Sequence, residues 1–449
     1  MAQRAGLLEL AGEHLTVPGG AGSAAGAKVS ALVAGMVAGA DSIEGMDLLR
    51  HGAMGRLFLG LRAPSTLGTF LRGFAFGHVR QLDAVAARFT TALARHAPLV
   101  RPGAAVSYLD VDDTVRATYG YAKQGAGYGY TRVKGLNAML ATVSGGGGAP
   151  VIVATRLRKG SVNSARGAAR LVTDAIKTSR SCGVAGVLVL RADSAYYGVE
   201  VIAAARRHHV HFSVTARKDK AVTAAIAAIP DDAWTPIRYP HAIFDEQLGC
   251  WISDAEVAEV GFTAFRSKPK AAQLSARLIV RRVRDANPDH VAVNAQGEPF
   301  RVWRHHAIFT DSPLPTLAAE ADHRRHAIIE QVIADLKAGP LAHLPSGRFA
   351  ANSAWLVLAD QRRRPDRDLR PAHHPAPTRR MALDPTMATA VHRSDRATGP
   401  SLNLHRRQAR PENNSGNAEH IGGSITPNLR RANQKINYIR SPSCTVDPG

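Results

Sequence analysis

Residues 107–116 read SYLDVDDTVR and place Asp110, Asp112 and Asp113 in a segment that otherwise has the apolar pattern of a buried strand. A buried carboxylate is destabilising unless it pairs with a cation or coordinates a metal ion. Side chains alternate between the two faces of a strand, so Asp110 and Asp112 share one face. The stretch therefore predicts a strand that carries an acidic site, with a metal ion as an early candidate ligand.

Strands and helices alternate around this stretch in a definite order. We expect strands in residues 105–113, 134–144, 150–161, 184–193 and 210–217, and helices in residues 164–183, 196–209 and 219–230. Three strands followed by helix, strand, helix, strand and helix is the order of an RNase H-like fold. The prediction is an α/β protein with a mixed five-stranded sheet and flanking helices.

Periodicity and composition divide the chain into five segments. They are a helical N-terminal region that is a candidate for DNA binding (1–100), the first part of the RNase H-like core (101–230), a β-rich insertion (231–314), a helix of the core (315–360) and a basic tail (361–449).

The tail differs in kind from the rest of the chain. Residues 361–449 hold 15 arginines and 10 prolines but one aromatic residue, Tyr438. Such a segment cannot bury enough apolar surface to offset its chain entropy, which predicts disorder. The change follows the apolar run AWLVLA (354–359) abruptly, and we favour a shifted reading frame as its cause over a basic nucleic-acid-binding tail.

Charge and cysteine usage narrow the class of protein. The 449 residues include 57 lysines and arginines against 36 acidic residues, a net charge of +21, which suggests a polyanionic partner with nucleic acid as the first candidate. The three cysteines lack the spacing of a zinc site or a disulfide framework. The apolar runs fall short of the roughly 20 residues that a membrane span needs, so we expect a cytoplasmic protein without a membrane partner.

Two further acids accompany Asp112. Asp193 ends the apolar run VLVLRAD, and in neighbouring parallel strands the two carboxylates would meet at the carboxyl ends, where they repel each other without a positive charge between them. Glu330 lies on a helical stripe beside the apolar residues that pack on the sheet, and we expect it to point at the two aspartates. Three carboxylates suit a site for two Mg²⁺ ions that transfers phosphoryl groups.

Two basic segments are candidate DNA contacts. The loop TYGYAKQGAGYGYTRVKG (118–135) mixes four tyrosines with cations that include Arg132 and Lys134, a composition that can stack on bases and hold phosphates. A hairpin without a ligand fits the same pattern. The run RLRKGSVNSARGAAR (156–170) is either a DNA-facing rim or a solvated surface.

Four motifs resemble the DDE transposases of bacterial insertion sequences, in the group-one DDE domain branch related to the IS4-like superfamily. They are VAGMVAGADSIEGMDLLRHG (33–52), LDVDDT (109–114), LRADSAYY (190–197) and HAIIEQVIADLKAGPLAHLPSGRFAANSAW (326–355). The resemblance implies an RNase H-like core with a β-rich insertion between the second and third acids.

The resemblance also implies a DNA transposase, with Asp112, Asp193 and Glu330 as catalytic acids that bind two Mg²⁺ or Mn²⁺ ions. Such an enzyme hydrolyses one strand at each element end, and the freed 3′ hydroxyl then attacks target DNA. Its partners would be terminal inverted repeats, target DNA and a second copy of the chain when bound to DNA. It would lie in the bacterial cytoplasm, associated with the nucleoid.

The family's third motif places Tyr, Arg, Glu and Lys at fixed spacing. Lys337 fits the spacing from Glu330, whereas His323 and His326 stand where Tyr and Arg would be. By this resemblance Arg324 or Arg325 takes over the phosphate contact, and both join Lys337 as candidate DNA-binding residues.

Two other functions remain open. A truncated or frameshifted remnant would bind DNA without catalysis. A haloacid-dehalogenase-like phosphatase would use the DxDxT pattern of residues 110–114, with Asp110 as nucleophile and Asp112 as general acid, although no later acidic pair is visible.

Overall fold

The computed structural model describes most of the chain before the predicted tail. The described residues are 2–58, 60–100, 103–119, 123–145, 148–237, 244–245, 250–251, 255–284, 292–293, 299–300 and 303–361. The predicted disorder and the proposed frameshift of residues 361–449 lie outside these residues, apart from Gln361.

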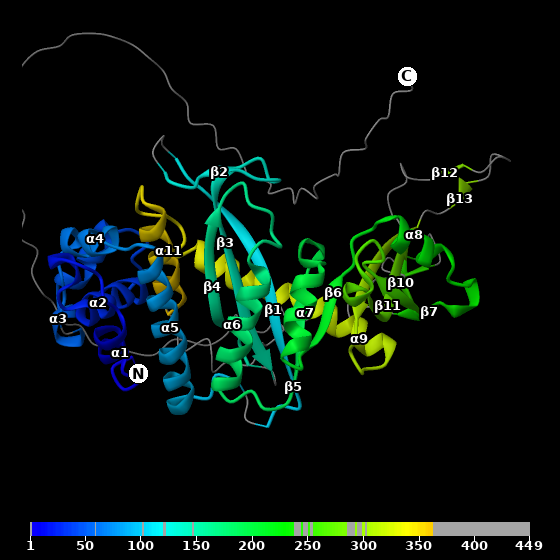
Figure 1. Cartoon of the computed structure of the whole chain (residues 1–449), viewed down its shortest axis with the longest axis horizontal. Coiled ribbons are helices and arrows are strands. Elements are labelled where there is room, and N and C mark those ends of the chain that lie inside the picture. Colours follow the sequence, from blue (N-terminus) through cyan, green and yellow to red (C-terminus); the bar gives the residue numbers. More distant parts are fainter. Residues whose placement is uncertain are drawn as a thin grey trace, which may run out of the picture. The chain divides into compact units, whose positions relative to one another are not determined.

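Five strands form the centre of the sheet (Figure 1). They are β1 (Val106–Ala117), β3 (Lys134–Gly145), β4 (Val151–Lys159), β5 (Val187–Ala192) and β6 (His211–Thr215). Their spatial order is β4-β3-β1-β5-β6. The pairs β1–β3 and β3–β4 are antiparallel, whereas β1–β5 and β5–β6 are parallel. This is the strand order of the predicted RNase H-like fold, which is confirmed.

Within the described residues the sheet contains ten strands, not only the five predicted, because strands from the insertion continue it past β6. They are β14 (Trp303–Thr310), β11 (Leu274–Arg284), β10 (Ala255–Ala264) and β7 (Thr235–Ile237), and β2 (Gly127–Tyr128) pairs with β3. The insertion also holds two short pairs, β8 (Phe244–Asp245) with β9 (Cys250–Trp251), and β12 (Ala292–Val293) with β13 (Pro299–Phe300). An uncovered β6 would expose unpaired backbone groups, and β14 satisfies them.

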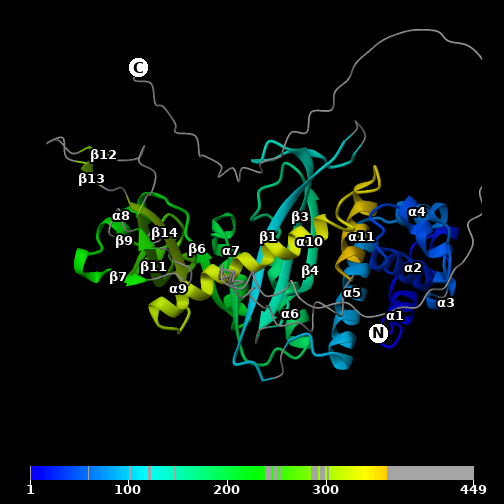
Figure 2. The same cartoon turned by 180° about the vertical axis from the view of Figure 1, so that it is seen from behind.

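Helices cover the central sheet on both faces (Figures 1 and 2). On one face lie α6 (Ala168–Ser181) and α7 (Val199–Arg207), and α8 (Lys220–Ala227) follows β6. On the other face, α9 (Thr316–Arg324), a 3₁₀ turn (Arg325–Ala327) and α10 (Ile328–Lys337) follow one another. Ile329, Ile333 and Leu336 of α10 are buried at helical spacing, as predicted for a helix that packs on the sheet.

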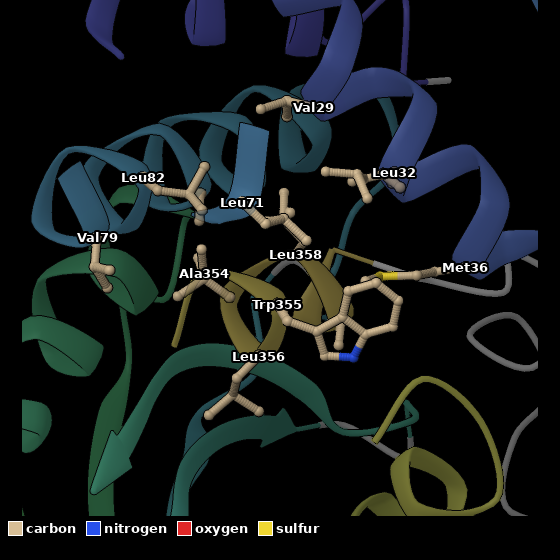
Figure 3. Packing of buried hydrophobic residues seen from close by; sticks show 14 of the residues in the cluster. Val29, Leu32, Met36, Leu71, Val79, Leu82, Ala354, Trp355, Leu356 and Leu358 are labelled. Carbon is tan, nitrogen blue, oxygen red and sulfur yellow. The ribbon is translucent and has the colours of Figure 1, made fainter. Parts of the chain in front are cut away.

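The N-terminal region is helical, as expected, and shares a core with the sheet. It comprises α1 (Leu7–His14), α2 (Ala25–Val37), α3 (Met54–Leu57), α4 (Pro64–Arg72) and α5 (Phe76–His96). Helix α11 (Phe349–Asp360) packs against α2, α4, α5 and β4, and Trp355 lies among their apolar side chains (Figure 3). Its indole N–H donates to the Pro340 carbonyl at 2.7 Å. A helix buried on all sides is typical of a protein core.

No helix within the described residues is long and apolar enough to span a membrane.

Candidate active site

Asp110 is the first of the three aspartates on β1 and is fully buried. Arg191, its register partner on β5, donates from Nε and Nη2 to the two carboxylate oxygens at 2.7 Å each. Nδ1 of His326 lies 2.9 Å from Oδ1 of the same carboxylate. A bidentate arginine is a strong and geometrically specific partner, so the charge of Asp110 is balanced inside the protein.

Asp113 lies one residue beyond Asp112, on the opposite face of β1. Its Oδ2 accepts hydrogen bonds from Arg158 of β4 and, at 3.1 Å, from the Tyr196 hydroxyl. Arg158 is itself buried and donates through Nε to Asn137 at 3.0 Å. Asp113 is therefore a second aspartate whose charge is balanced by a buried arginine.

Asp112 differs from both neighbours, because among the described residues it forms no ion pair. Within the described residues, Oδ1 of Asp112 accepts a hydrogen bond from the backbone N–H of Asp113 at 2.7 Å. Burial raises the pKa of the Asp112 carboxyl to about 7, and the negative charge of Asp193 contributes in the same direction.

Asp193 stands beside Asp112 at the end of β5. The last register pair of β1 and β5 is Val111 with Ala192, so the two aspartates follow on adjacent strands, with backbones about 5 Å apart. Oδ1 of Asp193 accepts from the Ala195 N–H at 3.0 Å and caps a 3₁₀ turn. Although Asp193 is exposed on one side, the protein atoms around its carboxyl raise its pKa. The structure thus brings two unpaired, mutually repelling carboxylates together.

Glu330 does not join them directly. The sequence suggested a position beside the buried face of its helix, but Glu330 is exposed on α10. Within the described residues, no three His, Cys, Asp or Glu side chains lie close enough together to hold a metal ion. The helical period predicts which residues share a face of α10, but it does not determine how far that helix lies from Asp112 and Asp193.

The neighbours of Glu330 nevertheless show which side of α10 it occupies. Lys337 follows it by seven residues on α10, a spacing that shares a helix face, and His326 lies in the 3₁₀ turn just before the helix. The charge of His326 lowers the pKa values of Asp112 and Asp193. Lys337 has a pKa that is lowered by burial and by Arg116, with Asp112 acting in the opposite direction. Glu330 therefore lies on the side of α10 that faces Asp112.

The two histidines in α9 and its following turn have different surroundings. Both ring nitrogens of His323 lie 3.0 Å from hydroxyl oxygens of β6, those of Ser213 and Thr215. Burial lowers the pKa of His323 to about 3, so its ring is neutral and anchors α9 to the sheet. His326 instead connects the Asp110–Arg191 pair to the candidate site. Sequence reasoning missed Arg191, although it lies two residues before Asp193 in the quoted motif.

The arginines expected to contact DNA phosphates have partners of their own. Nε of Arg324 donates to both carboxylate oxygens of Glu320, at 2.9 and 2.8 Å. Arg325 donates to Asp322 at 2.7 Å. These contacts do not favour the phosphate role, which stays a prediction.

The tyrosine-rich hairpin lies close to the aspartates. Tyr128 and Tyr130 are 67% and 79% exposed, and Arg132 at the tip is also exposed, whereas Lys134 begins β3 half-buried. The pKa of Tyr130 is raised by burial and by the charges of Asp113, Asp193 and Asp112. The hairpin therefore presents exposed aromatic rings and cations beside the two carboxylates.

Comparisons with known proteins place this arrangement in a family. A search among curated proteins finds no significant match. One solved structure, a piggyBac transposase synaptic complex with hairpin DNA, aligns at 10% identity and a TM-score of 0.35, over 81% of this chain and 70% of that chain. The family model for the transposase DDE domain, group 1, matches residues 27–361, which include Asp112, Asp193 and Glu330. The chain belongs to this family of transposase DDE domains.

Proposed function

We propose that the protein is a metal-dependent DNA transposase that cleaves one strand at each element end and joins the freed 3′ hydroxyl to target DNA. The family supports the reaction class. The observation that carries the assignment of residues is the contrast along β1: Asp110 and Asp113 are each paired with a buried arginine, whereas Asp112 and Asp193 form no ion pair among the described residues.

The donor set fits divalent metal ions. Hard cations such as Mg²⁺ prefer carboxylate oxygens, and two adjacent carboxylates with raised pKa values are stabilised by a cation between them. Asp112 and Asp193 would hold the ions. Glu330 is the proposed third ligand, although in the described residues it does not lie close enough to both aspartates to share an ion with them. When bound, the ions would activate the attacking oxygen and stabilise the leaving oxygen.

Other residues would bind and orient the DNA. Asp110 holds Nδ1 of His326, which directs the remaining ring nitrogen away from that carboxylate. Together with Lys337, His326 offers a polar contact for a phosphate beside the acids. The exposed rings of Tyr128 and Tyr130 can stack on bases of an opened strand end.

The phosphatase alternative requires Asp110 as a nucleophile. That role needs a carboxylate oxygen that can reach a substrate, but Asp110 is fully buried and both of its oxygens accept from Arg191. The surroundings of Asp110 therefore favour a structural role. A remnant that binds DNA without cleaving it is the second candidate, and it requires the same fold without metal-dependent activity.

A nicking assay on labelled element ends with Mg²⁺ or Mn²⁺ tests the proposal. Asp112→Asn, Asp193→Asn and Glu330→Gln are each expected to lower the nicking rate by roughly a thousandfold or more, because each removes a metal ligand. Asp335→Asn is the matched control, since Asp335 is exposed on the same helix and lies about 140° around the axis from Glu330.

The outcomes separate the candidates. Metal-dependent nicking that the three variants lose and the control keeps supports the transposase. DNA binding without any nicking supports the remnant. Nicking that survives Asp112→Asn contradicts the assignment of the acids.

A further inference from the structure

A groove of about 960 Å³ lies between α1, α5, α6 and β4. None of Asp112, Asp193 and Glu330 lines it. Among the described strands β4 pairs only with β3, so the groove runs along an edge of the sheet. Figure 1 shows α5 and α6 beside this edge.

Two basic stripes line the groove. Arg80, Arg88 and Arg95 of α5 are eight and seven residues apart, which places them on one helix face over about 22 Å. Arg170 and Lys177 of α6 are seven residues apart and line the groove as well. Since α5 and α6 contact each other, the two stripes border a common channel.

In the groove, Arg80, Arg156 and Arg170 outnumber the two carboxylates nearest to them, those of Asp83 and Asp174. Arg80, Arg156 and Arg170 approach the single carboxylate of Asp174 at 3.6, 3.2 and 3.1 Å. The second carboxylate, Asp83, lies 2.7 Å from Arg80, and burial raises its pKa to about 6, so it gives up its negative charge more easily than an ordinary aspartate.

Arg156 shows this imbalance most directly. Its pKa is lowered by burial and by the neighbouring charge of Arg80. Its Nε is buried and has no hydrogen-bond partner among the described residues. A buried donor without an acceptor is costly, so this part of the groove is suited to an anionic ligand.

Strand register fixes the distance from the groove to the candidate active site. Thr155 pairs with Leu140 on β3, and Leu140 pairs with Asp112 on β1. Two strand spacings separate Thr155 from Asp112, which is about 10 Å across the sheet. Arg156 pairs with Met139, as Asp113 does, so Arg156 and α6 lie on the face of the sheet opposite to Asp112. A ligand held in the groove would therefore lie around the edge of the sheet from the site, without overlapping it.

We propose that this groove binds the phosphodiester backbone of DNA on a surface separate from the catalytic acids. The cations extend over several phosphate spacings, which fits a polymer better than a single phosphate group, and arginines are strong phosphate donors. The choice of DNA rests on the proposed function. The groove would hold a DNA segment at the sheet edge, away from the face on which Asp112 lies.

A salt titration of DNA binding by the full chain tests the inference. The double variant Arg88→Glu/Lys177→Glu changes two exposed side chains that form no ion pair among the described residues. With a fluorescent DNA duplex and a chelator present, we expect affinity to fall on the order of tenfold and the slope of log affinity against log salt to decrease by about two. Arg95→Glu, at the far end of the same stripe, provides an independent second variant with about half the change in slope.

Arg207→Glu/Lys220→Glu is the matched control, because it makes the same charge change at exposed positions on α7 and α8. Equal losses in the groove and control variants would show a general charge effect and overturn the inference. Tighter binding of an RNA duplex than of the DNA duplex would overturn the assignment of DNA. Asp112→Asn should keep full DNA binding, so a protein that binds through the groove but never nicks would refute the proposed function alone.

Discussion

The candidate active site and the basic groove have opposite charge imbalances. Where the pairing of β1 with β5 ends, Asp112 and Asp193 stand side by side without an ion pair among the described residues. In the groove, three arginines share Asp174. Elsewhere in the same sheet, Asp110 and Asp113 are each balanced by one buried arginine. The difference indicates that this fold balances its structural charges internally and leaves imbalance where a ligand of opposite sign can bind.

The balanced pair also has a structural task. Arg191 joins β5 to β1 through Asp110 and also donates to the Asp322 carbonyl of α9. Its guanidinium lies over the Tyr108 ring, 4.1 Å from the ring centre. One ion pair thus fixes two parallel strands and the helix that leads to Glu330, which makes Asp110 a positioning residue for the site.

The largest expected effect is on the free energy of unfolding, and it distinguishes an aspartate in a buried ion pair from one without an ion pair among the described residues. Asp110→Ala should lower the free energy of unfolding by about 3–5 kcal/mol, because it leaves Arg191 buried without a counter-charge. Asp112→Asn should leave stability unchanged or raise it, because it removes a repelled carboxylate. Urea unfolding in the presence of a chelator measures both.

A double variant checks the reason for that loss. Asp110→Ala/Arg191→Met removes the whole ion pair and should recover part of the stability lost in Asp110→Ala. Equal destabilisation by Asp112→Asn and Asp110→Ala would contradict the distinction between the two aspartates.

The next effect is a pH dependence of stability in the absence of metal. The folded protein raises the pKa of Asp112 from 3.8 to about 7, so it binds this proton more tightly than the unfolded chain does. Protonation of Asp112 therefore contributes to the free energy of unfolding. This contribution is fully present below the pKa of the unfolded chain and is lost as pH rises through the pKa of the folded protein. Between pH 6 and 8, the wild type should lose about 1 kcal/mol relative to Asp112→Asn.

Metal addition sharpens the same measurement. Mg²⁺ or Mn²⁺ at pH 8 should raise the melting temperature of the wild type, because a cation that binds only the folded state stabilises it. Asp112→Asn and Asp193→Asn should show a smaller rise or none. If stability depended on pH in the same way in the wild type and in Asp112→Asn, the pKa of the Asp112 carboxyl would not be raised by folding.

Sequence patterns correctly predicted the order of the central strands and that Asp112 and Asp193 are neighbours; their catalytic role stays a prediction. Apolar runs and their alternation with helices are local properties, and parallel pairing brings the end of β5, which Asp193 follows, beside Asp112. Strand β1 itself continues beyond the predicted end at residue 113, to Ala117. The pairing of Asp110 with Arg191 depends on the register of two strands that lie far apart in the chain. No local pattern contains that register, so the partner was missed.

Two other differences have separate causes. The insertion was expected to be β-rich, but its joining to β6 depends on which sheet edge stays uncovered, a tertiary property. The ion pairs of Arg324 with Glu320 and of Arg325 with Asp322 have spacings of four and three residues. Helical spacing alone could have predicted them, whereas the family resemblance directed attention to phosphate contacts. The groove could not be predicted, because Arg80 and Arg156 belong to separate segments of the sequence and come together only in the folded protein.

The smallest expected effect concerns the acidic wall of the groove. Glu9 and Glu13 of α1 are exposed and line the groove opposite its basic stripes, so they oppose a polyanion. Glu9→Gln/Glu13→Gln should strengthen DNA binding by about twofold at low salt, with the gain fading as salt screens the charges. Glu200→Gln/Asp232→Asn, at exposed positions outside the groove, should change affinity less. An equal gain in both double variants would mean that DNA binding depends on the net charge of the protein and not on the groove. The basic groove could then no longer be contrasted with the acidic site as a place for a ligand of opposite charge.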